Sequence, residues 1–286
     1  MTLLIPSLTC SAIQSGGNKN HSFRYLCPIF IQPPMQIPAG KKIYFLSDFH
    51  LGVPDHASSL QREKLIVKFL DEAKADAAVI FIVGDLFDFW YEYKKVVPKG
   101  FVRILGKMAE ITDSGIPMHF FVGNHDMWMS GYFEKELNIP VYHEPKTFEF
   151  NGKKFLVGHG DGLGPGDHGY KFMKKIFRNK ICQALFGILP PYIGMGIAHR
   201  SSKSSRAATG DDDAKFLGEE NEWLIIYCKE ILKKEHFDYF IFGHRHLPID
   251  FQLKDNSRYI NLGDWIRYYS YAEFDGQQVY LKYYTA

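Results

Sequence analysis

The most informative segment of the chain is Lys42-Ile43-Tyr44-Phe45-Leu46-Ser47-Asp48-Phe49-His50-Leu51-Gly52. Its apolar first half predicts a buried strand, and an acid and a histidine follow two positions apart. Residues i and i+2 of an extended segment share one side, so Asp48 and His50 can face one point beyond the strand. A carboxylate oxygen and an imidazole nitrogen suit a divalent cation such as Mn²⁺, Fe²⁺ or Zn²⁺. A single Asp-x-His also fits an ordinary polar turn, so the pattern indicates a metal site only if other strands end in the same way.

The same arrangement recurs four times further along the chain. Four more apolar runs, each expected to be a strand, end in a glycine followed by a metal-binding side chain; these ends are Gly84-Asp85, Gly123-Asn124, Gly158-His159 and Gly243-His244-Arg245-His246. Glycine at these places lets the backbone turn sharply and approach an ion. Helical spacing of apolar residues over 59–75 and about 100–114 separates the first strands. Residues 249–284 alternate and predict antiparallel strands, so the expected class is an α/β layered sandwich.

Ligands of α/β sheets bind beyond the carboxyl ends of the strands, so the five strand ends predict one common site. Seven candidate metal ligands lie there: Asp48, His50, Asp85, Asn124, His159, His244 and His246. Seven are too many for one ion with an open position, and they suit two ions about 3.5–4 Å apart that share a carboxylate. Asp85 stands alone at its strand end and is the expected bridge.

Length and composition place the chain among ordinary globular proteins. Its 286 residues allow one large domain or two small ones, and 46% apolar with 23% charged residues is typical of a soluble protein. Aromatic residues reach 16%, enough for a large core or an apolar ligand site. The net charge of +2 gives no argument for nucleic acid, which is not expected as a partner. The four scattered cysteines favour a reducing, cytosolic setting.

The ends of the chain carry different signals. Residues 1–40 lack periodicity and collect prolines and glycines, so we expect a poorly ordered extension before a domain over 41–286, with Met35 as a possible true start. No export signal or transmembrane helix is expected, because a basic n-region and an apolar run of about 18 residues are both missing. The sequence gives no signal for an oligomeric state.

In their order, these motifs resemble those of the calcineurin-like metallophosphoesterases over about residues 43–265. The resemblance implies a four-layer α/β/β/α sandwich with a dimetal centre, most simply two Mn²⁺. One ion would be held by Asp48, His50, Asp85 and His246, and the other by Asp85, Asn124, His159 and His244. His125 and Asp126 would form an acid pair in which the carboxylate orients the histidine. The ions would activate water for in-line attack on phosphorus, while His125 stabilises charge or protonates the leaving oxygen.

Further motifs are similar to those of UDP-2,3-diacylglucosamine pyrophosphatases, enzymes of lipid A biosynthesis that release UMP and an acyl-sugar 1-phosphate. The matching segments are Asp48–Gly52, Gly84–Trp90, His159-Gly160-Asp161 and Leu262-Gly263-Asp264-Trp265. The resemblance implies that an insert over about 162–235 forms a helical cap above a lipid chamber. The cap would lie peripherally on the cytoplasmic face of the inner membrane. The implied substrate contacts are Asn124, His125, Asp167, Ser202, Lys203, Arg206 and His244.

One motif departs from that group and keeps an alternative open. Proteobacterial members carry Gly-Asn-Arg-Asp where this chain has Gly123-Asn124-His125-Asp126, so a metallophosphoesterase acting on another phosphodiester or nucleotide stays possible. A contiguous apolar cavity near the metals would favour the acylated substrate. A catalytically silent binding module is the third hypothesis, and the complete set of seven ligands argues against it.

Overall fold

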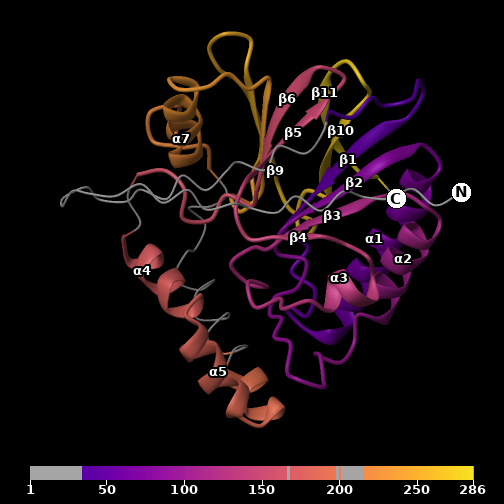
Figure 1. The fold of residues 1–286 in the computed structure, drawn as a ribbon, viewed down its shortest axis with the longest axis vertical. Helices are drawn as coiled ribbons and strands as arrows, with labels where there is room; N and C mark the ends of the chain where they lie inside the picture. Colours follow the sequence, from indigo (N-terminus) through magenta and orange to yellow (C-terminus); the bar gives the residue numbers. More distant parts are fainter. Residues whose placement is uncertain (1–33, 166–167, 198–199, 201–214, 286) are drawn as a thin grey trace, which may run out of the picture.

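The computed structural model describes residues 34–165, 168–197, 200 and 215–285. Within these residues two β-sheets face each other, with helices on their outer faces (Figure 1). The first sheet has the order β11-β10-β1-β2-β3-β4, from Val279–Tyr283, Ser270–Phe274, Lys42–Leu46, Ala77–Val83, Met118–Phe121 and Val141–Tyr142. The second has the order β5-β6-β7-β9-β8, from Lys146–Phe150, Lys153–Val157, Tyr239–Phe242, Arg258–Leu262 and Pro248–Gln252.

The described helices fall into two groups. Three accompany the first sheet: α1 (His56–Lys74), α2 (Val102–Asp113) and α3 (Tyr132–Glu136). The second group follows β6 in the chain and includes α4 (His168–Phe177), α5 (Lys180–Ile188), a helical segment over 191–197 and α7 (Trp223–Leu232). In Figure 1, α4 and α5 extend away from the sheets, whereas α7 lies on the outer side of the second sheet.

Three apolar layers hold the sandwich together. Ile66 of α1 and Met108 of α2 pack against the first sheet, and the fully buried Phe45 and Phe155 fill the space between the sheets. The third layer joins α7 to the second sheet through Leu224, Ile225 and Cys228, which pack against Leu156 and Phe240. Burial of these side chains is the main force that joins the layers. The predicted four-layer α/β/β/α sandwich is confirmed.

Contacts among the described residues bear on two of the expected boundaries. The insert was expected to reach about residue 235, but α7 belongs to the sandwich because the apolar side of Leu224, Ile225 and Cys228 covers the second sheet. Residues 34–40 were assigned to the poorly ordered extension. Instead Met35 exchanges backbone hydrogen bonds with Glu149 and Asn151, of 2.9 and 3.1 Å. Residues 1–33 lie outside the described part of the chain.

Parallel pairing places the carboxyl ends of five strands at the same end of the sandwich. β1, β2 and β3 are parallel to one another in the first sheet, and β6 and β7 are parallel in the second. The segments that follow these strands carry the predicted ligands. No helix among the described residues is long and apolar enough to cross a membrane.

Candidate active site

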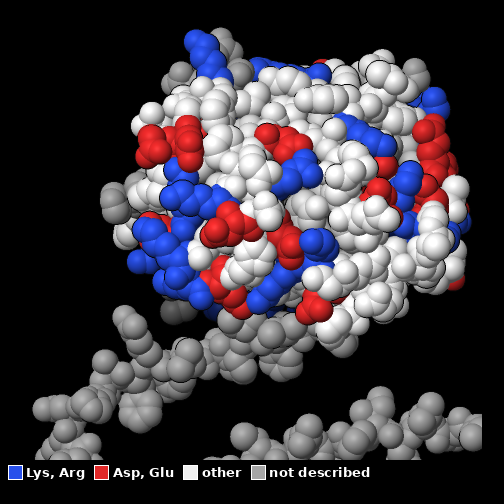
Figure 2. All heavy atoms as spheres, turned by 90° about the horizontal axis from the view of Figure 1, so that it is seen from above, with Lys and Arg blue, Asp and Glu red and all other residues white. Residues whose placement is uncertain are grey.

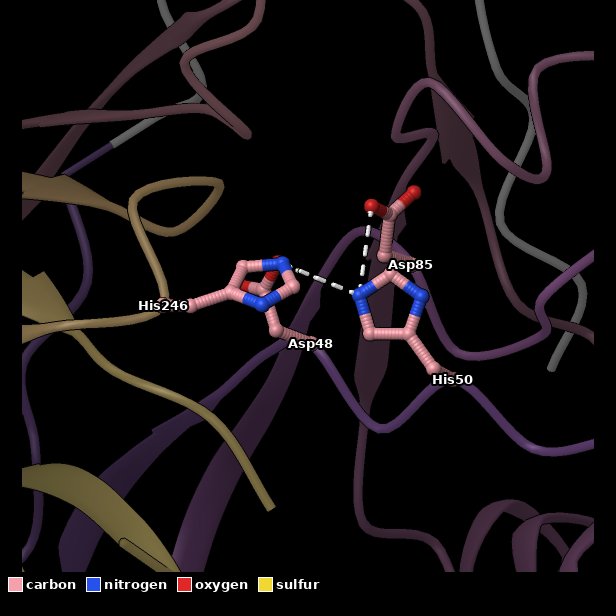
Figure 3. A group of neighbouring side chains, drawn as sticks. All are labelled: Asp48, His50, Asp85 and His246. Carbon is pink, nitrogen blue, oxygen red and sulfur yellow. Dashed lines mark hydrogen bonds and ion pairs between the residues drawn. The ribbon is translucent and has the colours of Figure 1, made fainter. Parts of the chain in front are cut away.

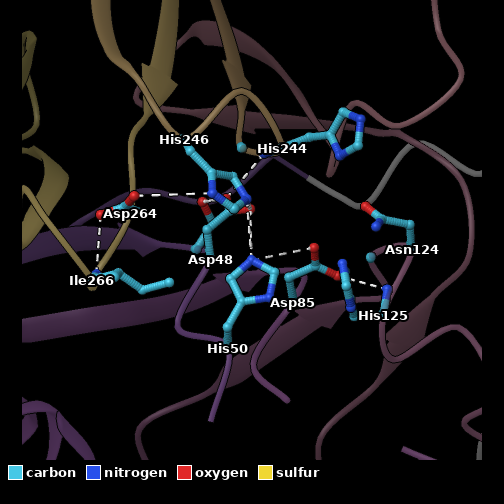
Figure 4. Close-up of polar contacts among 12 residues, drawn as sticks. Asp48, His50, Asp85, Asn124, His125, His244, His246, Asp264 and Ile266 are labelled. Carbon is cyan, nitrogen blue, oxygen red and sulfur yellow. Dashed lines mark hydrogen bonds and ion pairs between the residues drawn. The ribbon is translucent and has the colours of Figure 1, made fainter. Parts of the chain in front are cut away.

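The structure brings the seven predicted ligands together at this end of the sandwich. Figure 4 labels all of them except His159. Asp48, His50, Asp85 and Asn124 follow strands of the first sheet, and His159, His244 and His246 follow strands of the second. One group of ligand atoms within 4.8 Å of one another comprises Asp48, His50, Asp85 and His246, and a second comprises Asp85, His159 and His244. The two groups share Asp85, the carboxylate expected to bridge two ions.

The first group is compact and buried (Figure 3). His246 Nε2 lies 3.2 Å from Asp48 Oδ1 and 3.1 Å from His50 Nε2. His50 Nε2 lies 3.7 Å from Asp85 Oδ2. Asp48, His50 and Asp85 are at most 1% exposed. Four donor atoms from three different loops therefore surround one small space.

The second group shares the Oδ2 atom of Asp85 with the first group. His159 Nε2 lies 3.4 Å from Asp85 Oδ2 and 3.2 Å from Asn124 Oδ1. Its other nitrogen, Nδ1, is 2.8 Å from the carbonyl oxygen of Val83 and therefore carries the proton in that tautomer. This contact directs Nε2 of His159 toward the shared carboxylate.

Five of the seven predicted ligands adopt a left-handed backbone conformation. The φ angles are 55° for Asp48, 44° for His50, 52° for Asp85, 67° for His244 and 50° for His246. Residues other than glycine adopt this region infrequently, and each such residue costs on the order of 1–3 kcal/mol unless its surroundings support it. The surroundings do so for His50, since buried Arg62 of α1 donates to its carbonyl oxygen at 2.8 Å.

Two glycines make room for ligand side chains. A Cβ on Gly123 would lie 2.1 Å from Asp85 Oδ1, and one on Gly84 would lie 2.4 Å from His159 Nδ1. From the sequence, the expected reason for these glycines is a sharp turn of the backbone near an ion. In the structure, these two are required because neighbouring ligands occupy the space of a side chain.

The carboxylates dominate the electrostatics of the cluster. Burial lowers the pKa of His50, but Asp48, Asp88 and Asp85 more than reverse this and raise it to about 10. Burial also lowers the pKa of His159, which the Asp85 and Asp48 carboxylates raise to about 10. Burial raises the pKa of Asp85, but its histidine neighbours hold it well below the usual value. Without cations, His50 and His159 therefore favour their protonated forms.

The donor set fits divalent cations. Asp48 Oδ1 and Asp85 Oδ2 are buried, and among the described residues neither has a hydrogen-bond partner of acceptable geometry. Buried carboxylate oxygens normally have a partner, so these two oxygens favour the binding of a positively charged ion. Oxygen and imidazole nitrogen donors suit Mn²⁺, Fe²⁺ or Zn²⁺. Two groups that share Asp85 suit a pair of ions.

The structure gives His125 a contact with Asp88, whereas the predicted acid pair assigned that part to Asp126. His125 Nδ1 donates to the carbonyl oxygen of Asp88 at 2.9 Å, and Asp88 Oδ1 is 3.6 Å away. Asp126 instead accepts backbone N–H groups of Gly123 and Leu86 at 2.7 and 2.8 Å. It therefore ties the loop after β3 to the loop after β2. Both loops carry ligands, so Asp126 supports the geometry of the site without orienting His125.

Two supporting residues had no predicted role in the site. Asp264 Oδ2 lies 3.9 Å from His246 Nδ1, while its Oδ1 accepts N–H groups from Ile266 and Arg267 at 3.0 and 2.7 Å. Arg62 supports His50 as described above. Asp264 belongs to the Leu262-Gly263-Asp264-Trp265 motif, and that motif could have indicated its role. Arg62 lies in a stretch of helical spacing, where no sequence pattern distinguishes it. Asp167, Ser202, Lys203 and Arg206, the other predicted substrate contacts, lie outside the described residues.

The family model described as calcineurin-like phosphoesterase matches residues 41–248, more than half of the chain. The chain belongs to the calcineurin-like phosphoesterase family. As a metallophosphoesterase, it is a metal-dependent hydrolase. The family expected from the sequence motifs is confirmed.

Proteins of known name are similar to this metallophosphoesterase over most of their length. A UDP-2,3-diacylglucosamine hydrolase of Porphyromonas gingivalis is 41% identical over 255 residues, which cover 84% of this chain and 97% of that protein. The protein of the same name from Shigella dysenteriae is 28% identical, over 77% of this chain and 90% of that protein. A solved structure of a phosphoesterase from Streptococcus pneumoniae, described as predicted, has a TM-score of 0.39 and 14% identity, over 86% and 89% of the two chains.

Proposed function

We propose that this metallophosphoesterase cleaves the pyrophosphate of UDP-2,3-diacylglucosamine to UMP and 2,3-diacylglucosamine 1-phosphate, a reaction of lipid A biosynthesis. The similar protein from Porphyromonas gingivalis, matched over 97% of its length, carries the name of that substrate. The observation that carries the proposal is the gathering of seven predicted cation ligands, with an apolar cavity that begins at the loop of two of them. The substrate has the matching parts, a charged pyrophosphate and two acyl chains.

Two divalent ions, which we expect to be Mn²⁺, would occupy the two donor groups. One would be held by Asp48, His50, Asp85 and His246, and the other by Asp85, Asn124, His159 and His244. When bound, such ions supply positive charge at the phosphoryl oxygens and lower the pKa of a water from ~15.7 to near neutrality. Asp85 would serve both ions, since its Oδ2 faces His50 Nε2 and His159 Nε2 at 3.7 and 3.4 Å.

His125 is the proposed catalytic side chain. Its ring lies 4.8 Å from the ring of His50, measured between centroids, so it borders the first donor group. Asp88 fixes the ring by accepting from Nδ1 at 2.9 Å. A ring held in this way can stabilise negative charge on the phosphoryl group or protonate the leaving oxygen. The proposed substrate contacts are Asn124, His125, Asp167, Ser202, Lys203, Arg206 and His244.

An apolar cavity whose wall includes Leu51 and Gly52, in the loop that carries Asp48 and His50, supports an acylated substrate. Its volume is about 710 Å³, and its wall begins at Leu51 and Gly52, immediately after the predicted ligand His50. The apolar part of the wall comes from α1, from the segment before and at the start of α2, and from residues after α5. These side chains are Leu60, Phe89, Val96, Val97, Phe101, Val102, Tyr192 and Met195. This position meets the requirement that an acyl chain lie close to a reacting pyrophosphate.

The helices of the insert support peripheral binding to a membrane surface. On α5, Ile181, Leu185 and Ile188 are 69%, 61% and 76% exposed, and their spacing places them on one side of the helix. Exposed apolar residues gathered on one side of a helix mark an interaction site. A lipid substrate makes the cytoplasmic face of the inner membrane the expected partner. On the face in Figure 2, basic and acidic side chains are interspersed.

Two assays test the proposal. The first compares UMP release from UDP-2,3-diacylglucosamine with hydrolysis of a simple aryl phosphodiester; a strong preference for the lipid substrate is expected. A preference for the aryl ester would instead favour the broader phosphodiesterase alternative. The second replaces the shared ligand, Asp85→Ala, which should abolish Mn²⁺-dependent hydrolysis of both substrates. Unchanged activity would contradict the dimetal mechanism.

A further inference from the structure

The insert is fastened to the sandwich where it leaves β6. Asp161 follows the predicted ligand His159 by two residues and is 5% exposed. Its Oδ2 accepts from Tyr170 Oη at 2.6 Å and lies 2.5 Å from Lys174 Nζ. Lys174 also donates to the Asp161 carbonyl oxygen at 2.8 Å. Tyr170 and Lys174 lie one turn apart on α4, so the first helix of the insert is held by a residue of a ligand loop.

The insert is fastened a second time where it returns. Arg245 lies between the predicted ligands His244 and His246 and is 1% exposed. Its Nε and Nη2 both donate to the carboxylate of the fully buried Glu222, each at 3.1 Å. Nη2 also donates to the carbonyl oxygen of Lys215 at 2.6 Å. This bidentate pair joins residues 215–222 to the second histidine loop.

The two attachments meet around His244. Gly243 N donates to the His159 carbonyl oxygen at 2.9 Å, which joins the two ligand loops. A Cβ on Gly164 would lie 2.5 Å from the carbonyl oxygen of Trp223, so the start of the insert lies against the start of α7. The rings of Tyr170 and Trp223 each lie 6.2 Å from the ring of His244. His244 is therefore near one aromatic residue of the insert, Tyr170, and near the first residue of α7, Trp223.

Stability alone is a weak reason for these buried ion pairs. Removing two charges from water is costly, and apolar side chains of similar size often stabilise a core equally well. Arg245 also stands between two left-handed residues, with φ angles of 67° and 50°. Because Nε and Nη2 of Arg245 both donate to Glu222, the side chain is held in place and restricts the rotation of the backbone on either side. The pair can thus maintain an unfavourable backbone conformation that His244 and His246 require.

We propose that Arg245–Glu222 and Lys174–Asp161 are positioning pairs that couple the placement of the insert to the orientation of His244 and His159. The inference rests on the proposed metal centre and goes beyond it, because it assigns these four residues an effect on metal binding. They act through the histidines and touch neither ion nor reacting atoms. Disturbing an attachment of the insert should therefore weaken metal binding at a distance.

The test uses the full chain, stripped of metal and titrated with Mn²⁺ by calorimetry. Arg245→Lys keeps the charge but loses the bidentate geometry, and we expect about tenfold weaker binding of one of two ions, as for other residues that orient metal ligands. The visible absorption spectrum of the Co²⁺-loaded variant should change as well. Arg258→Lys is the matched control, because Arg258 makes a bidentate pair with Asp250 between β9 and β8. It should match the wild type in both measurements.

The outcomes separate this inference from the proposed function. A wild type that binds no pair of ions would contradict the metal centre itself. A wild type that binds two ions, with Arg245→Lys unchanged in affinity and Co²⁺ spectrum, would overturn the positioning role alone.

If Arg245→Lys does not fold, the double variant Arg245→Met/Glu222→Leu removes both charges, so that neither is left buried without a partner. Weakened binding by this variant at wild-type thermal stability supports the inference, and wild-type affinity overturns it. Lys174→Met, compared with exposed Lys233→Met, tests the first attachment in the same way.

Discussion

Asp88 contacts His125 through its backbone as well as facing it with its side chain: its carbonyl oxygen accepts from His125 Nδ1 at 2.9 Å, and its Oδ1 is 3.6 Å from the same nitrogen. The same Oδ1 lies 3.8 Å from Nδ1 of the predicted ligand His50. One carboxylate therefore serves both a proposed catalytic histidine and a metal ligand. Removing its charge should impair catalysis while leaving the fold intact.

The first prediction compares Asp88→Asn with Asp126→Asn. Asp88→Asn should lower kcat about 10–100-fold, within the range that acid–base groups contribute, and change KM little. Asp126→Asn should mainly lower the melting temperature, because Asp126 accepts N–H groups that join two loops. Steady-state kinetics and thermal denaturation distinguish the two. A stable Asp126→Asn variant with the larger loss of kcat would restore the original pairing of Asp126 with His125.

The second prediction concerns the space beside Asp85. Gly123→Ala would place a methyl group 2.1 Å from Asp85 Oδ1 and displace the shared carboxylate. We expect at least tenfold weaker metal binding, measured by titration of the metal-free protein. The control is Gly106→Ala on α2, where no atom lies within 4 Å. This change should raise stability by about 0.5–1 kcal/mol and leave metal binding unchanged. Equal metal affinity in both variants would refute the steric argument.

The third prediction concerns stability in acid. His119 of β3 stacks on Phe81, with 4.8 Å between centroids, and its Nδ1 is 3.1 Å from Tyr142 Oη. Burial lowers its pKa to about 4 from the model-peptide value of 6.5. The folded state thus favours neutral His119, so its contribution is complete above pH 6.5 and is lost as the pH falls toward 4. The loss is on the order of 2–3 kcal/mol.

Urea denaturation of the metal-free protein across this pH range gives the measurement. His119→Phe should be less stable than the wild type near pH 7, and the difference should shrink toward pH 4. The predicted metal ligands are identical in both proteins, so their contribution cancels in the comparison. Exposed His236→Gln provides the control and should run parallel to the wild type. A difference that stays constant with pH would contradict the assignment to His119.

The fourth prediction tests the exposed side of α5. Leu185→Glu with Ile188→Glu should reduce co-sedimentation with anionic lipid vesicles, since charge opposes burial in the acyl region. Hydrolysis of a soluble aryl phosphodiester should be retained, because these side chains lie outside the donor groups. The matched control is Tyr283→Glu on β11, a residue that is 57% exposed and does not line the cavity. Equal vesicle binding by all proteins would contradict peripheral attachment through α5.

Sequence patterns predicted much of this arrangement for a physical reason. A parallel strand buried on both faces is continuously apolar, so its end is marked in the sequence, and all such ends meet at one edge. Asp48, His50 and the later ligands could therefore be grouped without any knowledge of distances. Alternation in the tail likewise predicted its strands, as β8 to β11 show.

The missed features depend on tertiary contacts. Asp88 holds His125 through a carbonyl oxygen, which any residue type could supply, so composition carries no signal for it. Helix α7 has the apolar spacing of any amphipathic helix, and only its contact with Phe240 separates it from the insert. The pairing of Arg245 with Glu222 spans 23 positions and two elements. Local patterns report neither which carbonyl is accessible nor which charges meet.

The division of the seven donors between two sheets has a consequence for the whole sandwich. Four come from loops of the first sheet and three from loops of the second, so bound cations would join the two halves of the core at one end. A ligand that binds only the native form stabilises it by RT ln(1 + [L]/Kd), about 2.7 kcal/mol at a hundredfold excess over Kd. Resistance to unfolding would then follow the free concentration of divalent cation, and chelation would separate the sheets first at the end that carries out the chemistry.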